Sequence, residues 1–353
     1  MMHDDIKKLL YDLYGLTVSE IKQFVSYYDK NFLIRTRQLE ESKEYLLKIH
    51  KSNSIVQYEA ETKLLEHLRD KNVAAPIPVK TLDSKWFHVL SISDSETYII
   101  RLFIYIPGTI LFNCGQYTRN LLKLLGDYVG KIDVALKTFH HSFYDDYIHD
   151  WSLLSFKNIT HEQLLTIDNL EYRNIVKMIQ KQFQTDIVDK KHLFQYGQIH
   201  GDINDQNIII NDTNDMIIAI IDYGDSHRSY YIFELAITIL YVLLFDENTI
   251  EDLSYGTHVL KGYTKYIQFN QDELKVLPIC IKARLCQSLI NGLRAYKLDP
   301  TNTYVMTTQK LGWKFLMKLT MMSNDEIMEQ FLHESSLNST SDTKTLISTK
   351  NIC

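Results

Sequence analysis

The sequence predicts an α+β fold in two parts, a sheet-rich N-terminal part and a larger, mainly helical C-terminal part. Short strand-like segments dominate up to residue 107, and longer segments with helical spacing of apolar residues follow. A strand that runs into Pro107–Gly108 marks the boundary, because Pro-Gly pairs interrupt regular structure. We therefore expect one domain over residues 1–107, a second over 108–332, and a disordered tail in the polar, low-complexity residues 333–353.

Composition limits the class of protein and its partners. The chain has 353 residues, 45% of them hydrophobic and 23% charged, as in ordinary globular proteins. Its net charge of −6 argues against nucleic acid or an anionic membrane as the main partner, since both require a basic face. The apolar run 235–245 is too short to span a bilayer. The acidic start has no signal-peptide core, and the four cysteines lack metal or redox spacing. We expect a cytoplasmic protein with free thiols.

The N-terminal elements follow from apolar spacing and from turn residues. Residues 6–14 have the spacing of a short amphipathic helix, and residues around 59–68 that of a second helix. Pro76 and Pro78 end the second helix. Strand-like segments precede and follow it, at 21–28, 31–37 and 45–50, and then at 86–92 and 98–105.

The C-terminal elements are mostly helices. The clearest covers 121–139, where apolar residues form one stripe. Further helical segments cover 171–183, begin near 232, and extend over 271–297 and 304–318. Between them, the short apolar segments 208–211 and 217–222 are joined by Asp-Thr-Asn-Asp, which predicts a β-hairpin.

The groups that carry chemistry lie at the ends of this hairpin. His200-Gly201-Asp202 and Asn207 precede its first strand, and Asp222-Tyr223-Gly224 follows its second strand. One carboxylate that accepts a hydroxyl proton, with an amide oxygen and a second carboxylate that hold Mg²⁺, suits phosphoryl transfer. Protein kinases have the same parts in His-Arg-Asp-x-x-x-x-Asn and Asp-Phe-Gly. The alternative is a polar loop in which Asp and Asn only form turns.

These residues resemble the signature of the aminoglycoside phosphotransferase and choline kinase superfamily. The resemblance implies the two-lobed protein-kinase fold, with 1–107 as the nucleotide-binding lobe. It implies Asp202 as catalytic base, and Asn207 and Asp222 as Mg²⁺ ligands. No activation loop or Ala-Pro-Glu element separates Asp225 from the helix near 232, so we expect a small-molecule substrate rather than a polypeptide.

The resemblance also implies nucleotide contacts in the first lobe. Lys48, at the end of a strand, would contact the phosphates, and Glu61 would steady it, with Glu59 as the second choice; a solvated lysine is the alternative. The turn 26–31, which ends at Asn31, would cover the phosphates, although it lacks the glycines of the protein-kinase loop and also fits a plain hairpin. The backbone from Phe103 to Tyr105 would bind the nucleobase.

Segments outside these motifs resemble the branch of the superfamily that phosphorylates 5-hydroxylysine. They include 101–108, 222–236, 285–289, 299–304 and 307–313. This resemblance implies GTP as donor, although the residues themselves do not separate GTP from ATP. Asp225 is the candidate for a substrate ammonium group, or else an acid at a helix N-terminus. Kinases of other amino alcohols (choline, ethanolamine, homoserine, an aminoglycoside) and a nucleotide-binding pseudokinase are the alternatives.

Overall fold

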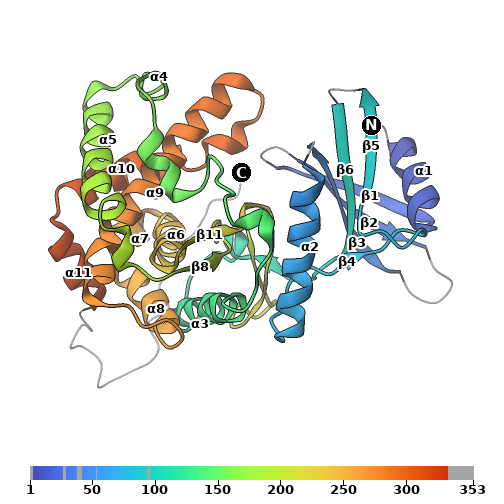
Figure 1. Ribbon diagram of the computed structural model, residues 1–353, viewed down its shortest axis with the longest axis horizontal. Coiled ribbons are helices and arrows are strands. Elements are labelled where there is room, and N and C mark those ends of the chain that lie inside the picture. Colours follow the sequence, from blue (N-terminus) through green and yellow to red (C-terminus); the bar gives the residue numbers. More distant parts are fainter. Residues whose placement is uncertain (1–2, 27–28, 38–41, 53, 94–95, 333–353) are drawn as a thin grey trace. The chain divides into compact units, whose positions relative to one another are not determined.

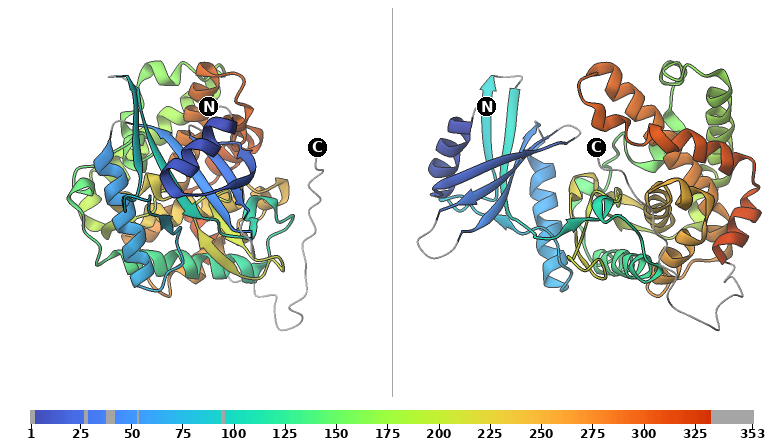
Figure 2. Two further views of the ribbon diagram at one scale, coloured as in Figure 1. Left: turned by 90° about the vertical axis from the view of Figure 1, so that its right-hand side faces the viewer. Right: turned by 180° about the vertical axis from the view of Figure 1, so that it is seen from behind.

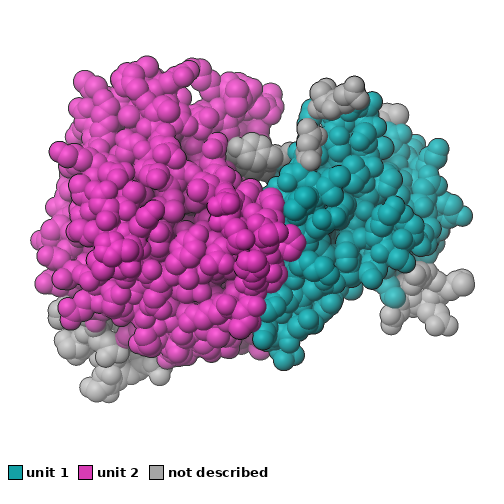
Figure 3. Space-filling view, in the orientation of Figure 1, with its two compact units in different colours: residues 1–107 teal, residues 108–353 magenta. Residues whose placement is uncertain are grey.

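The computed structural model describes residues 3–26, 29–37, 42–52, 54–93 and 96–332. The chain divides into two compact units, 1–107 and 108–353, which meet in sequence at Pro107 and Gly108 (Figure 3). An antiparallel sheet dominates the first unit and helices dominate the second (Figure 1). The α+β class is therefore confirmed. The expected disordered tail and part of the turn 26–31 lie outside the described residues.

The first unit is built on one antiparallel sheet. Its strands have the order β1-β2-β3-β6-β4, and β5 also pairs with β6. The strands are β1 (Val18–Phe24), β2 (Lys30–Thr36), β3 (Glu44–Lys51), β4 (Pro78–Val79), β5 (His88–Ser93) and β6 (Glu96–Ile104). Two helices complete the unit, α1 (His3–Tyr14) and α2 (Ile55–Asp70).

The two faces of this sheet differ in chemistry because side chains alternate along each strand. One face is apolar and packs under Ile6 and Leu10 of α1. It contains Phe32, Ile34, Leu47, Ile49, Ile100 and Leu102. The other face carries polar residues (Asn31, Lys48, His50 and Arg101) among apolar ones and is covered by α2, which lies across the sheet from α1 (Figures 1 and 2). The sheet thus has one face that stabilises the unit and one that is available for chemistry.

The second unit combines helices with two small sheets. Its strands are β7 (Thr109–Ile110), β8 (Tyr196–Ile199), β9 (Ile208–Ile210), β10 (Ile217–Ile220) and β11 (His227–Tyr230). The sheets have the orders β10-β9-β7 and β11-β8. The α-helices are α3 (Arg119–Leu136), α4 (His161–Leu164), α5 (Leu170–Phe183), α6 (Tyr231–Leu243), α7 (Glu247–Glu251), α8 (Ser254–Tyr263), α9 (Gln271–Leu298), α10 (Gln309–Thr320) and α11 (Asn324–Leu332). None of the described helices combines the length and apolar character needed to cross a membrane.

The expected elements are largely present. The hairpin forms as β9 and β10, with Ile208 opposite Ile220. The helix expected over 304–318 begins later, at Gln309, because residues 303–306 form a separate 3₁₀ turn. The pairing of β8 with β11 was not expected from the sequence. It joins the segment before the candidate catalytic loop (residues 200–207) to the segment after Asp222.

Candidate active site

The hairpin brings the three candidate phosphoryl-transfer residues together. Asn207 stands directly before β9, and its carbonyl accepts a hydrogen bond from Ile221 N at 2.8 Å, so Asn207 lies beside the residue that precedes Asp222. The Asn207 side-chain amide donates to the Asp202 carbonyl at 2.9 Å and to Asp202 Oδ2 at 3.0 Å. Because its Nδ2 faces Asp202, the Oδ1 of Asn207 remains as its acceptor.

Asp222 adopts a left-handed backbone conformation, with φ 67° and ψ 67°. A residue other than glycine rarely adopts this conformation, which costs on the order of 1 kcal/mol. The strain lies where the chain leaves β10 and turns into the 3₁₀ segment 223–225. Such strain is common at functional sites, and here it fixes the direction in which the carboxylate leaves the strand.

His200 connects the two motifs. Its Nδ1 accepts from the backbone N–H of Asp202 at 3.2 Å, and its Nε2 lies 3.0 Å from the carbonyl of Ile221. Since Nδ1 accepts, the ring proton belongs on Nε2, and the imidazole is neutral. His200 is fully buried. It therefore braces the catalytic loop against the segment that carries Asp222 and is not placed to transfer protons.

Glu234 of α6 binds the backbone at the start of the catalytic loop. It is the one acid in the otherwise apolar first turns of α6, and its carboxylate accepts from the backbone N–H groups of His200 and Gly201. Burial raises the pKa of Glu234 to about 7, although these two hydrogen bonds oppose the rise. An acid alone in an apolar helix was the sequence signal, but the signal does not reveal its partner.

Asp202 lies in a polar cage. Its Oδ2 accepts from Asn204 at 2.8 Å and from Asn207, while its Oδ1 pairs with Arg284 Nη2 of α9 at 2.8 Å. Burial raises the pKa of Asp202 to about 7; the Arg284 guanidinium opposes the rise, and negative Asp225 and Asp222 add to it. A carboxylate with this pKa is suited to accept a proton near neutral pH.

Arg284 was not expected at this position. From the sequence, Arg284 could contact a substrate carboxylate or be a solvated or salt-bridged arginine; the structure places it fully buried, 82 residues along the chain from its partner Asp202. Its Nη1 donates to the carbonyl of Trp151 at 2.7 Å and to Gln287 Oε1 at 3.2 Å. Through these contacts Arg284 supports Asp202, the candidate base, and ties it to Trp151 and Gln287.

The segment 149–152 contacts both Arg284 and Asp225. Gln287 Nε2 donates to the carbonyls of Asp150 and Ser152, each at 2.9 Å, and so fixes this segment to α9. His149 Nε2 lies 3.1 Å from the Asp225 carbonyl, and its Nδ1 lies 3.7 Å from Asp225 Oδ1. Burial lowers the pKa of His149 to about 4, so this imidazole is neutral. Asp225 thus supplies negative charge close to the base.

Tyr304 is another residue that the sequence analysis did not assign. Its hydroxyl donates to Gln206 Oε1 in the catalytic loop at 2.8 Å. Burial raises the pKa of Tyr304, and the nearby carboxylates of Asp202, Asp205 and Asp222 raise it further. Two aspartates of the loop, Asp202 and Asp205, and two beyond the hairpin, Asp222 and Asp225, thus place negative charge in this region, which suits a cationic substrate.

The first unit carries a second polar cluster on the face below α2. Asn31 of β2 lies opposite Lys48 of β3, and Lys48 lies opposite Arg101 of β6, so the three form one row across the sheet. Lys48 and Arg101 are buried, and Arg101 Nη1 lies 2.8 Å from Glu61 Oε2 of α2. The structure thus brings Asn31, Lys48 and Glu61 together. The ion pair shown for Glu61 is with Arg101, and its pairing with Lys48 stays a prediction.

Arg101 also links this row to the turn that precedes β2. Its Nη2 lies 3.1 Å from His50 Nε2, and His50 Nδ1 lies 2.8 Å from Asp29 Oδ2. Burial lowers the pKa of His50, which favours the neutral ring, with Nδ1–H donating to Asp29 and Nε2 accepting from Arg101. The network holds the end of the turn, the sheet and α2 in one arrangement.

The proposed nucleobase segment is more constrained than expected. The Phe103 side chain is buried, and the Arg101 Cζ lies 5.1 Å from the centre of the Phe103 ring. The backbone N–H groups of Ile104 and Tyr105 donate to the carbonyls of Ile77 and Glu44, at 2.9 and 3.2 Å. A nucleobase would therefore have to use carbonyl groups of this segment or residues beyond it.

The residues at the hairpin fit a magnesium ion. Asn207 offers an amide oxygen and Asp222 a carboxylate, and Mg²⁺ in kinases is held by one or two such oxygens together with substrate phosphates. No group of three or more His, Cys, Asp or Glu side chains in the described ranges is arranged to hold a metal by itself. A site that needs the nucleotide to complete it agrees with both observations.

Comparisons with known proteins agree with this geometry. Residues 20–268 match the model of the phosphotransferase enzyme family (APH). Hydroxylysine kinases of Mus musculus and Bos taurus are 27% and 28% identical, each over 91% of this chain and 90% of the relative. Among solved structures, an amicoumacin kinase superposes with a TM-score of 0.68 at 16% identity, over 92% of this chain and 100% of that one. An aminopropanol kinase superposes with a TM-score of 0.67 at 14% identity, over 90% and 99%. The chain belongs to the phosphotransferase enzyme family and is a small-molecule kinase that transfers phosphate to a hydroxyl group.

Proposed function

We propose that the chain transfers the γ-phosphate of GTP to the 5-hydroxyl of 5-hydroxy-L-lysine. The observation that carries the reaction type is the hairpin end, where Asn207 bonds to Asp202 and lies beside the segment of Asp222. The choice of acceptor is supported by the hydroxylysine kinases, which match this chain nearly end to end. The choice of GTP rests on the same resemblance.

The charge around the loop supports an acceptor with ammonium groups. Arg284 and two side-chain amides fix the position of the Asp202 carboxylate. We assign this carboxylate as the acceptor of the proton from the hydroxyl that attacks the γ-phosphorus. Asp225 is the proposed contact for a substrate ammonium group. Because Arg284 is a buried cation against the base, the ammonium groups would lie on the side of Asp225 and the hydroxyl on the side of Asp202.

Asn207 and Asp222 would hold Mg²⁺, which when bound neutralises charge on the nucleotide phosphates. Lys48 would bind the same phosphates from the first unit. Glu61 would hold the row of Asn31, Lys48 and Arg101 in place through its ion pair with Arg101. Asn31 belongs to that row and would contact the phosphates from β2. Phe103 and Tyr105 would flank the nucleobase.

A screen of donors against acceptors tests this function directly. Purified protein would be assayed for nucleoside diphosphate release with MgGTP or MgATP, each with 5-hydroxylysine, lysine, choline, ethanolamine, homoserine or an aminoglycoside. We expect the highest kcat/KM for GTP with 5-hydroxylysine and no turnover with lysine, which lacks the hydroxyl. The Asp202→Asn variant keeps an acceptor for Arg284 but removes the base, and should be about 10²–10⁴-fold slower.

The outcomes separate the assignments. A preference for choline, ethanolamine, homoserine or an aminoglycoside would overturn the acceptor but retain the reaction type. A preference for ATP would overturn the donor alone. An Asp202→Asn variant as active as the parent would overturn the assignment of the base.

A further inference from the structure

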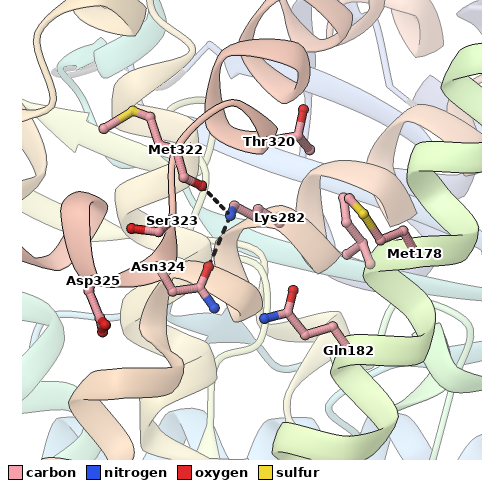
Figure 4. A pocket seen from close by; sticks show the side chains of 9 residues that line it. Met178, Gln182, Lys282, Thr320, Met322, Ser323, Asn324 and Asp325 are labelled. Carbon is pink, nitrogen blue, oxygen red and sulfur yellow. Dashed lines mark hydrogen bonds between the residues drawn. The ribbon is translucent and has the colours of Figure 1, made fainter.

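A cavity of about 310 Å³ lies in the second unit, apart from the residues of the catalytic loop. Its walls come from α5, α9, the end of α10, the segment that follows α10 and the start of α11 (Figure 4). They include Met178 and Gln182 of α5, Lys282 of α9, and Met322, Asn324 and Asp325. Neither Asp202 nor Asp222 lines this cavity.

Lys282 is a buried cation without an anionic partner among the described residues. The residue is 5% exposed, and its Nζ donates to Asn324 Oδ1 at 2.9 Å and, more weakly, to the Met322 carbonyl at 3.5 Å. Both acceptors are neutral. Buried charges in proteins are normally paired, because transfer from water is otherwise costly. Burial accordingly lowers the pKa of Lys282 to about 8.

Three hydrogen-bond donors converge on the space beside Lys282. Asn324 accepts from Lys282 through Oδ1, so its Nδ2 is left as a donor. Figure 4 shows the side-chain amides of Gln182 and Asn324 turned toward this space from opposite walls. An ammonium and two amides facing one space form a site for a ligand rich in acceptors.

We propose that this cavity binds a small carboxylate anion through Lys282, Gln182 and Asn324. The N-terminus of α11, which starts at Asn324, lies at the same site, and its first turn carries the acids Asp325 and Glu326. Two features favour a monoanion with an apolar part over phosphate. Asp325 is an exposed acid at the rim that would repel a dianion, and Met178 offers apolar contact.

The site is separated from the reacting groups but lies on the same helix as one of their supports. Arg284, which holds Asp202, follows Lys282 by two residues in α9, and side chains two apart on a helix point in different directions. A bound carboxylate would therefore join α5, α9 and α11 without contact to the substrate. Its effect should appear first in the stability of the folded chain.

Thermal unfolding of the full chain with sodium acetate, propionate or butyrate tests the proposal, against sodium chloride and phosphate at matched ionic strength. For the wild type, we expect a saturable rise in Tm with one or more carboxylates, about 4 °C at a hundredfold excess over Kd. Lys282→Met should lose this rise, and Lys181→Met, which alters an exposed lysine of α5, should keep it. Asp325→Asn should bind more tightly, because a like charge is removed from the rim.

Several results would overturn the proposal. They are no saturable rise in the wild type, an equal rise in Lys282→Met, or a rise with phosphate but not with carboxylates. If Lys282→Met does not fold, Gln182→Leu takes its place, with binding expected to weaken about tenfold. An unchanged Kd in Gln182→Leu would then count against the site. Lys282→Met without added anion should be no less stable than the parent, since it removes an uncompensated buried charge.

Discussion

At the scale of single residues, the proposed reaction depends on the charge state of Asp202, the proposed base. The carboxylate must be ionised to accept a proton, and its pKa is raised to about 7 by burial. We therefore expect kcat/KM to rise with pH through about 7 and to fall tenfold per unit below it. The measurement is a pH–rate profile with saturating MgGTP. A profile that is flat between pH 5.5 and 8 would contradict the assignment of this group as base.

Arg284 should set the position of that profile. Arg284→Met removes the cation that opposes the rise in the Asp202 pKa, so the acidic limb should move to higher pH and activity should return as pH increases. Arg284→Lys keeps the charge and should move the limb less. Arg294→Met, at a partly buried arginine of the same helix whose contact is Asn291, is the matched control. A purely structural role for Arg284 would lower activity equally at every pH.

The residues that could be predicted from the sequence are those that lie close together along the chain. Asp202, Asn207 and Asp222 span one loop and one hairpin, so their spacing carries the signal. Arg284, Glu234 and Tyr304 contact the same loop from helices and a turn 30 to 100 residues away. In the sequence, Arg284 and Tyr304 look like ordinary residues of their elements, and Glu234 stands out only as an acid in an apolar helix, without a visible partner. The alignment of Lys48 with Arg101 could not be predicted from the sequence either, because it depends on the register between β3 and β6.

At the scale of elements, α3 and α8 are held together by glycines that meet at their crossing. A Cβ on Gly126 of α3 would overlap the carbonyl oxygen of Val259, and a Cβ on Gly262 of α8 would overlap that of Lys123. Backbone atoms cannot move aside as the end of a side chain can. Gly126→Ala should therefore lower the free energy of unfolding by about 1–3 kcal/mol, despite the better helix propensity of alanine.

Urea denaturation of Gly126→Ala and of the parent would measure this cost. Val134→Ala, at a 40% exposed position of the same helix, is the control and should change stability by about 0.5 kcal/mol or less. Equal stability of Gly126→Ala and the parent would show that the helices can separate without cost. The stripe of apolar residues predicted α3 from the sequence, but not the partner against which its glycines pack.

At the scale of the whole molecule, the division into two units places the proposed nucleotide contacts on both. Lys48 and Glu61 belong to the unit 1–107, while Asn207 and Asp222 belong to the unit 108–353. Each cluster has its own internal support, Arg101 in the first unit and His200 with Glu234 in the second. If one nucleotide uses both, its binding must stabilise the two units together.

We therefore expect MgGTP to raise the Tm of the wild-type chain and to make it unfold in a single transition. At a hundredfold excess over Kd, the added stability should be about 2.7 kcal/mol. Lys48→Met and Asp222→Asn should each remove most of this rise, although they alter different units. Asparagine tolerates the left-handed backbone of Asp222, so that variant changes the charge with little change in backbone strain.

Lys51→Met, at an exposed lysine of the same strand as Lys48, is the control. Chelation of Mg²⁺ with EDTA should have the effect of Asp222→Asn in the wild type. If either variant kept the full rise, its unit would not be holding the nucleotide phosphates.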